Sequence, residues 1–332
     1  MASYDALDNR VRELSNARYQ QYQQDLARWK GLADRAAKTQ KEQAKRRRDL
    51  MAAIGADLKK LDAALEKQNR ALEQDLKAFL EEFRPKAIDR PSCPSTFKDA
   101  AIRSAVLAES GHMVLPVFAS TIFTADQAYF NKLSGIKEWD GGAGGINSGW
   151  VFPDDPTKLF AKDVAHDPAA WCGFNWMHHV PQERAVHFAF IPATTATYEM
   201  TAVIAFHGFY ILRVDDDILT CKDAIVNLDV QMNVHQYADS GWKDFPLLYI
   251  DKQNADEITS YDRTHFLDYT TGLRAGDPVV VTAKITVEAL ADGGGAYSEL
   301  NFQDGTANYI LPLFLSVLQV NPASPTSTMA RS

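Results

Sequence analysis

The longest run of helical patterning covers the first 84 residues, which contain no proline and only two glycines, Gly31 and Gly55. The segment is rich in Ala, Leu, Glu, Gln, Lys and Arg, which favour helices, so it predicts one continuous helix. At about 1.5 Å per residue that helix would be roughly 120 Å long. A rod of this kind cannot bury its own apolar stripe, so we expect it to pair with other helices.

The stripe is clearest in the second half of this helix, where the spacing of apolar residues alternates between three and four. This spacing is typical of the a and d positions of a left-handed coiled coil. The predicted oligomerisation seam consists of Met51, Ile54, Leu58, Leu61, Leu65, Gln68 and Leu72. The expected partners are copies of this chain, with a trimer favoured over a dimer.

The first half of the helix is less regular and carries aromatic residues at Tyr19, Tyr22 and Trp29. These residues predict either a contact with an anchoring partner or packing within a looser bundle. Residues 38–48 hold six basic residues and one acidic residue. They indicate a contact with an anion, a solvated helix face, or the point where the rod folds into a hairpin. The lack of a turn-forming residue between 35 and 48 disfavours the hairpin.

Period-two patterning begins at Ala185 and predicts an antiparallel β head. Residues 226–234 and 279–289 each alternate between apolar and polar side chains, as strands with one buried face do. Further strands are expected at 198–206, 208–214, 246–251, 263–270, 297–303 and 308–318. The runs on either side of His207 and Gly208 form either one bent strand or two. The last strand is apolar on both faces, which places it in the centre of a sheet or in a subunit interface.

The segment between helix and head is more varied. Pro85, Pro91 and Pro94 predict the end of the long helix and a short connector. The pattern then predicts a helix over 96–110 closed by Gly111, a buried strand over 112–124, a brief helix over 125–134 and irregular structure over 135–184.

The predicted fold class is therefore α+β: a long N-terminal coiled-coil helix followed by an all-β antiparallel sandwich of jelly-roll kind with one or two short helices. The predicted parts are a stalk over 1–84, a linker over 85–95, a head over 96–320 and a disordered tail over 321–332.

Charge is unevenly distributed between these parts. The chain has a net charge of −8; residues 1–84 carry 18 Lys and Arg against 14 Asp and Glu, and the remainder carries 17 against 29. An acidic head argues against nucleic acid as the main ligand, because phosphate binding needs clustered cations. No secretory signal pattern and no membrane span are visible. We expect cytoplasmic synthesis, with association with a particle or release by a non-classical route as further expectations.

Tryptophan next to Asp and Asn is the most informative candidate chemistry in the head. An exposed indole stacks on the apolar faces of sugars, while carboxylates and amides bond their hydroxyls. The candidate ligand-binding residues are Trp171, Asn175, Trp176, Asp239, Trp242 and Asp244. The alternative is that these rings cover the core beneath long loops.

Metal sites are weaker candidates. Asp215, Asp216 and Asp217 could supply oxygen ligands to Ca²⁺, or form a solvated turn. His178, His179 and His187 match no zinc spacing, so no cofactor is expected. Cys172 and Cys221 either form a bridge or remain free thiols.

No nucleophile or metalloprotease motif is present, so we expect a non-enzymatic protein. The leading hypothesis is an oligomeric stalk-and-head protein that binds a glycan or cell-surface receptor through several copies of its head. The plan is similar to that of fibres and spikes that present a binding head in three copies. The alternatives are a structural component of a phage tail or contractile particle, and a hydrolase acting on polysaccharide.

Overall fold

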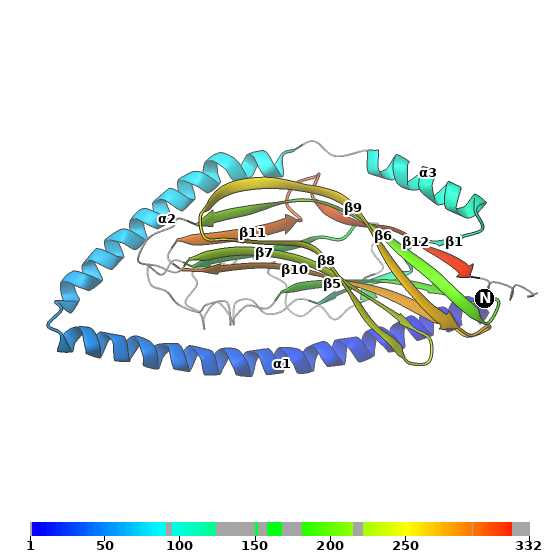
Figure 1. Ribbon diagram of the computed structural model, residues 1–332, viewed down its shortest axis with the longest axis horizontal. Helices are drawn as coiled ribbons and strands as arrows, with labels where there is room; N and C mark the ends of the chain where they lie inside the picture. The colour runs from blue at the N-terminus through cyan, green and yellow to red at the C-terminus, as the bar shows by residue number, and fades with distance from the viewer. Residues whose placement is uncertain are drawn as a thin grey trace, which may run out of the picture.

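The computed structural model describes most of the chain. The described residues are 2–90, 95–123, 150–151, 158–167, 181–214, 222–293 and 295–320. They form a two-layered β-sandwich and a helical hairpin whose two arms lie on opposite faces of that sandwich (Figure 1). The predicted helix over 125–134 and the predicted tail lie outside the described residues.

The predicted continuous rod is wrong because the helix breaks after Ala53. The helices α1 (Ala2–Ala53) and α2 (Leu58–Ile88) are joined by a turn in which Gly55 has a φ of 83°. Glycine adopts this left-handed conformation without the steric cost that a Cβ imposes. Asp57 caps α2, and its carboxylate accepts a hydrogen bond from the Lys60 amide at 3.2 Å. The hairpin turn therefore follows the basic run instead of falling within it.

Pro85 does not end α2, which continues to Ile88. A proline inside a helix removes one hydrogen bond and is ordinarily destabilising. Here the last turn packs against the sandwich, with Ala87 buried and Ile88 beside it. Tertiary packing thus extends the helix into the predicted linker. The third helix, α3 (Ser95–Glu109), is followed by Gly111 at a φ of 85°, as the sequence predicts.

Two antiparallel sheets confirm the predicted β-sandwich. Sheet I has the order β1-β12-β6-β11-β4, with β9 paired along the other edge of β6, and sheet II has the order β3-β2-β5-β10-β7-β8. The strands are β1 (Met113–Leu115), β2 (Ala119–Phe123), β3 (Trp150–Val151), β4 (Ala161–Asp167), β5 (Gln182–Phe190), β6 (Ala196–Val214), β7 (Asp223–His235), β8 (Asp239–Lys252), β9 (Ala255–Leu273), β10 (Val279–Asp292), β11 (Ala296–Phe302) and β12 (Tyr309–Val320). The jelly-roll connectivity stays a prediction.

The core lies between the two sheets. Every second residue of β7 from Ala224 to Val234 is buried, and β10 alternates in the same way along most of its length, as their patterns predict. The two runs around His207 form one strand, β6, which decides between the two alternatives. A Cβ on Gly208 would lie 2.3 Å from the Phe302 ring. Glycine there permits the close approach of β11.

Three parts of the sandwich either differ from the predicted strands or decide between predicted alternatives. The predicted strand over 112–124 is divided at Pro116 into β1 and β2, which belong to different sheets. The strand β4 lies within the region that the sequence predicts to be irregular. Its side chains are buried on both faces and several of them are polar, so its sequence shows no alternation of apolar and polar residues. The apolar β12 lies inside sheet I between β1 and β6.

The arm formed by α1 lies on the outer face of sheet II. Val11 and Leu14 pack there against Ala119, Ala189 and Val280. The aromatic residues further along this arm turn towards the same chain: Tyr22 is buried, and its ring centroid lies 6.2 Å from that of Trp29. These rings therefore pack within the molecule.

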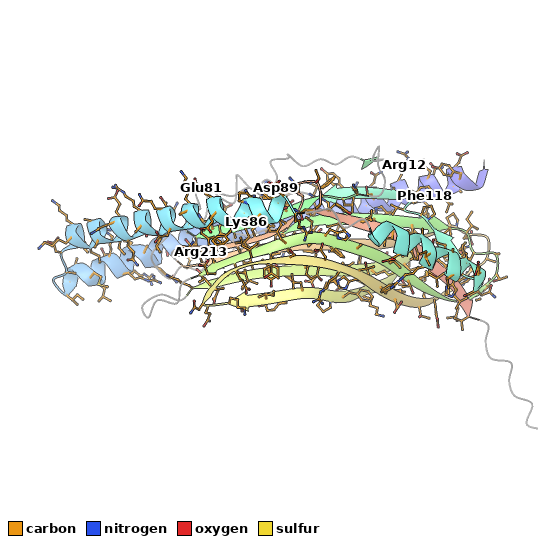
Figure 2. All side chains as sticks on the ribbon, turned by 90° about the horizontal axis from the view of Figure 1, so that it is seen from above. Arg12, Glu81, Lys86, Asp89, Phe118 and Arg213 are labelled. Atoms are coloured by element: carbon orange, nitrogen blue, oxygen red, sulfur yellow. The ribbon has the colours of Figure 1, made fainter. Side chains whose placement is uncertain are left out.

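The arm formed by α2 lies on the outer face of sheet I. Leu76 and Phe79 pack against Phe209 and Ile211. The Arg213 guanidinium stands 4.8 Å from the centroid of the Phe79 ring, beneath the helix (Figure 2). Both ends of the helical segment are thus attached to the head of their own chain.

The predicted seam lies mainly at the bend of the hairpin. Met51, Leu58, Leu61 and Leu65 line a hollow of about 270 Å³ between α1 and α2. Of the remaining seam residues, Ile54 and Gln68 are exposed and Leu72 lies beside Gly295. This arrangement does not show a coiled coil with other copies. None of the described helices is both long and apolar enough to cross a membrane.

Candidate functional site

The described candidate residues all lie on β8, the edge strand of sheet II. They are Asp239, Trp242 and Asp244. The other candidates, Trp171, Asn175 and Trp176, and the candidate calcium ligands Asp215, Asp216 and Asp217 lie outside the described residues.

Strand register brings Trp242 and Asp244 together with polar residues of β7 and β10. Trp242 pairs with Asn233 and Asp244 with Gln231, on the face of sheet II that points away from the core. A bulge near Asp229 shifts the register by one residue, so Tyr249 lies on the same face as Trp242 and pairs with Asn227. We call this face the polar shelf, made of Asn227, Asp229, Gln231, Trp242, Asp244, Tyr249, Lys284 and Glu288.

Two aromatic rings stand on the polar shelf and reach solvent. Trp242 is 41% exposed and Tyr249 is 64% exposed. Seven residues of strand separate them, which corresponds to about 20 Å at the usual rise per residue. Both rings are therefore accessible from solvent on the same face of the sheet.

The carboxylates and amides of the polar shelf lie between these rings. The Gln231 amide donates to Asp244 at 2.6 Å, and the Asn227 amide donates to Asp229 at 2.8 Å and to Glu288 at 3.4 Å. Partial burial and the nearby charges of Asp251, Asp223 and Glu288 raise the pKa of Tyr249. The shelf is therefore acidic and rich in acceptors for hydroxyl groups.

The α1 arm forms one wall of the shelf. Arg18 donates to Asn233 at 3.0 Å, and its guanidinium lies 4.8 Å from the Trp242 ring centroid. On the same indole, the Lys284 ammonium lies 5.6 Å from the centroid and 3.5 Å from Glu183. Burial lowers the pKa of Arg18 to about 10, against the favourable charge of Asp239, so the cation persists at neutral pH.

Asp239 holds α1 instead of extending the shelf. Arg10 donates to His235 Nε2 at 2.7 Å, which makes His235 Nδ1 the donor to Asp239 at 3.0 Å. Arg18 approaches the same carboxylate at 3.8 Å. The chain from Arg10 to Asp239 fixes the helix beside the shelf.

Sequence reasoning missed most of the shelf. Asn227 and Glu288 come from strands whose predicted alternation marks them as facing solvent. Tyr249 lies in the predicted strand over 246–251, which does not alternate in burial. The missing information was the register of β8 on β7, which a bulge displaces. Simple alternation from Trp242 would place Tyr249 on the opposite face, so a search at alternate positions of the strand would have missed it.

Of the three histidines considered as metal ligands, His187 lies within the described residues, where it is part of the packing beneath α1. His187 is fully buried beneath α1, within 3.2 Å of the Ser15 hydroxyl and 2.9 Å of the Thr282 hydroxyl. Burial and the charge of Arg18 lower the pKa of His187 to about 3. His178, His179, Cys172 and Cys221 lie outside the described residues, and within the described part no group of three or more His, Cys, Asp or Glu is arranged to hold a metal ion.

A second charged cluster lies beneath α3, beside a hollow of about 280 Å³. Arg90 donates twice to Asp262, at 2.7 and 2.9 Å, and His207 Nδ1 lies 3.0 Å from the same carboxylate. Arg90 also donates to Asn308 at 2.8 Å. The donors surround Asp262 and fix the segment that follows α2 to sheet I, which is a structural role.

Comparison with known proteins adds little to this geometry. No protein-family model matches the chain, and no curated protein matches it. Among solved structures, the chain is similar to Eiger TNF from S. frugiperda, with 15% identity over 42% of this chain and 68% of that chain and a TM-score of 0.17. It is also similar to TmCBM61 in complex with β-1,4-galactotriose, with 6% identity over 50% and 85% of the two chains and a TM-score of 0.16. Such low scores carry no argument about fold or function.

Proposed function

We propose that this protein is a non-enzymatic carbohydrate-binding protein whose ligand lies along the polar shelf. The observation that carries the proposal is the pair of exposed rings, Trp242 and Tyr249, on one outward face of β8. Indole and phenol rings stack on the C–H faces of sugars. The acceptors between them, including Asp244 and Glu288, would bond the hydroxyl groups.

The charge pattern narrows the class of glycan. The shelf carries Asp229, Asp244 and Glu288, whose carboxylates accept hydrogen bonds and repel other anions. Its one lysine, Lys284, lies near Glu183. A neutral oligosaccharide fits this surface better than a sulfated or uronic-acid polymer.

The decisive experiment measures binding of the full chain to a panel of neutral and acidic glycans, followed by calorimetry on the strongest ligand. We expect Trp242→Ala and Tyr249→Ala each to weaken binding by about tenfold, as loss of a stacked ring is worth on the order of 1–3 kcal/mol. The matched control is Phe266→Ala, which removes a 46% exposed ring from β9 of the other sheet. Equal losses in all three variants, or no binding to any glycan, would refute the proposal.

Turnover separates binding from hydrolysis. The same panel is incubated with the protein and examined for new reducing ends. We expect binding without cleavage. Cleavage that persists in purified protein would replace the proposal with the hydrolase alternative.

Self-association through the hairpin stays a prediction that glycan binding does not require. The residues at its bend, Met51, Leu58, Leu61 and Leu65, are half-buried in one chain, which leaves little of the predicted seam for a partner. Light scattering gives the mass in solution. A trimer would restore multivalent display by the head, and a monomer would remove it.

A further inference from the structure

The end of the helical hairpin, residues 38–60, projects beyond the sandwich at the far end from the N-terminus (Figure 1). These residues form the last turns of α1, the connecting turn and the start of α2. We call residues 38–60 the hairpin tip. In Figure 1 the two helices meet at the bend, beyond the strands, and diverge from there towards the two faces of the sandwich. Residues 41–50 are all exposed. The glycan proposal makes no use of it.

The hairpin tip is strongly basic in an acidic protein. It contains eight Lys and Arg against three Asp and Glu, a net charge of +5 in a chain of net charge −8. The rest of the molecule therefore carries −13. This separation of charge orients the molecule in the field of an anionic surface, with the tip forward and the head away.

Apolar side chains are exposed at the same tip. Leu50 is 64% exposed and Ile54 is 71% exposed. Arg46 and Leu50 lie one turn apart on one face of the end of α1. Ile54 follows in the connecting turn, and its amide donates to the Leu50 carbonyl at 3.1 Å. The other face is occupied within the hairpin, where Arg48 donates twice to Asp62 at 2.8 Å. The outward face thus combines cations with two large aliphatic groups that nothing in the described residues covers.

We propose that the hairpin tip docks on the surface of an anionic lipid bilayer. Leu50 and Ile54 enter the interfacial layer, and the surrounding Lys and Arg contact the lipid phosphates and carboxylates. A nucleic acid would satisfy the charges and leave the aliphatic groups in water. A second copy of the same tip would bring +5 against +5. The bilayer is the occupant that uses both features.

The test is flotation of the full chain with phosphatidylcholine vesicles that either contain or lack phosphatidylserine. We expect binding only to the vesicles that contain phosphatidylserine, and loss of that binding in high salt. Lys45→Glu combined with Arg46→Glu should weaken it by at least about 25-fold, because each basic residue near a charged surface contributes roughly fivefold. The control pair, Lys252→Glu with Arg263→Glu, makes the same charge change on exposed residues of the head.

Leu50→Gln combined with Ile54→Gln separates a bilayer from other polyanions. This pair leaves every charge in place and changes only exposed side chains, so the fold is retained, as circular dichroism will verify. We expect vesicle binding to weaken by at least about tenfold, since two aliphatic side chains that leave water only in part contribute less than they would on full burial. Unchanged vesicle binding in this variant, tighter binding to RNA than to vesicles, or a smaller solution mass would each overturn the proposal.

Discussion

The two arms of the hairpin are attached to the sandwich by different chemistry. The α1 arm rests on aliphatic packing and on a neutral histidine, His187, between two hydroxyl groups. The α2 arm adds ionised groups to the packing of its apolar side chains, with Arg84 donating to Glu299 at 3.0 Å and to Asp304 at 2.8 Å. The cation of α1, Arg18, lies near the half-exposed Asp239, whereas Arg84 of α2 pairs with the fully buried Glu299, so the two attachments should respond differently to mutation and to pH.

The α2 attachment is a complete polar network. The Glu299 carboxylate is fully buried, and it accepts from Arg84, from the Tyr297 hydroxyl at 2.6 Å and from the Asn301 amide at 2.6 Å. Asp304 joins the network through Lys162 at 3.2 Å. Such a cluster is stable only while every charge keeps its partner.

The largest effect is therefore expected from Arg84→Ala. The change leaves Glu299 buried without its cation, which should lower the free energy of unfolding by about 3–5 kcal/mol. Urea denaturation measures this loss. The control is Lys86→Ala, two residues away, where the exposed pair with Glu82 contributes at most about 0.5 kcal/mol. A loss below about 1 kcal/mol for Arg84→Ala would mean that water replaces the guanidinium.

Leu14→Ala tests the opposite attachment. Leu14 is buried against sheet II, so its truncation leaves a cavity and should cost about 2–4 kcal/mol. Hydrogen exchange should show faster opening of amides in residues 4–29, while amides of α2 near Phe79 keep their protection. Glu13→Ala, on the exposed side of the same turn, is the control. Equal loss of protection in both arms would show that the hairpin opens as one unit.

Acid should loosen the α1 attachment first. The pKa of His187 is lowered to about 3 by burial and by Arg18, while an unfolded histidine titrates near 6.5. Between these values the unfolded chain binds the extra proton, so stability falls as the pH decreases, by about 1.4 kcal/mol per pH unit. We expect the α2 attachment to weaken less over this range. Its Asp304 has a pKa below the usual value, because Asn301 and Lys162 outweigh the effect of burial.

Urea midpoints at pH 7, 6 and 5 measure this slope, in wild type and in His187→Gln. The glutamine cannot accept a proton, so the variant should lose the His187 share of the slope. If both proteins show the same pH dependence, the titrating group lies elsewhere.

The sequence was sufficient for the parts of the fold that local pattern dictates. The alternation in β7 and β10 placed their buried residues correctly, and the proline-free N-terminal segment is helical. What it could not supply were contacts between distant segments. Which residues share the polar face of β4 and which share the polar shelf depends on strand register. The attachment of α2 depends on a contact between Arg84 and Glu299, which lie 215 positions apart in the sequence.

The hairpin turn was visible in the sequence but outweighed there by helix propensity. Gly55 and Asp57 are a glycine stop and an N-cap separated by a single residue, and together they form a recognisable boundary. The apolar spacing continues across this boundary, from Met51 to Leu58, because apolar side chains of both helices line the hollow at the bend. A stripe with regular spacing therefore does not show that its helix is continuous.

Gly55→Ala should have the smallest effect on the free energy of unfolding, and it tests directly whether the helix bends at residue 55 or continues as a rod. A Cβ at Gly55 meets no atom within 4 Å, so the only penalty is its φ of 83°, which should cost about 1 kcal/mol. Gly31→Ala is the matched control, because Gly31 lies within α1, also meets nothing within 4 Å and is outside the left-handed region. There alanine should stabilise the protein by about 0.5–1 kcal/mol. Opposite signs in urea denaturation support a bend at residue 55, whereas stabilisation by both substitutions would mean that the helix runs straight through it in solution.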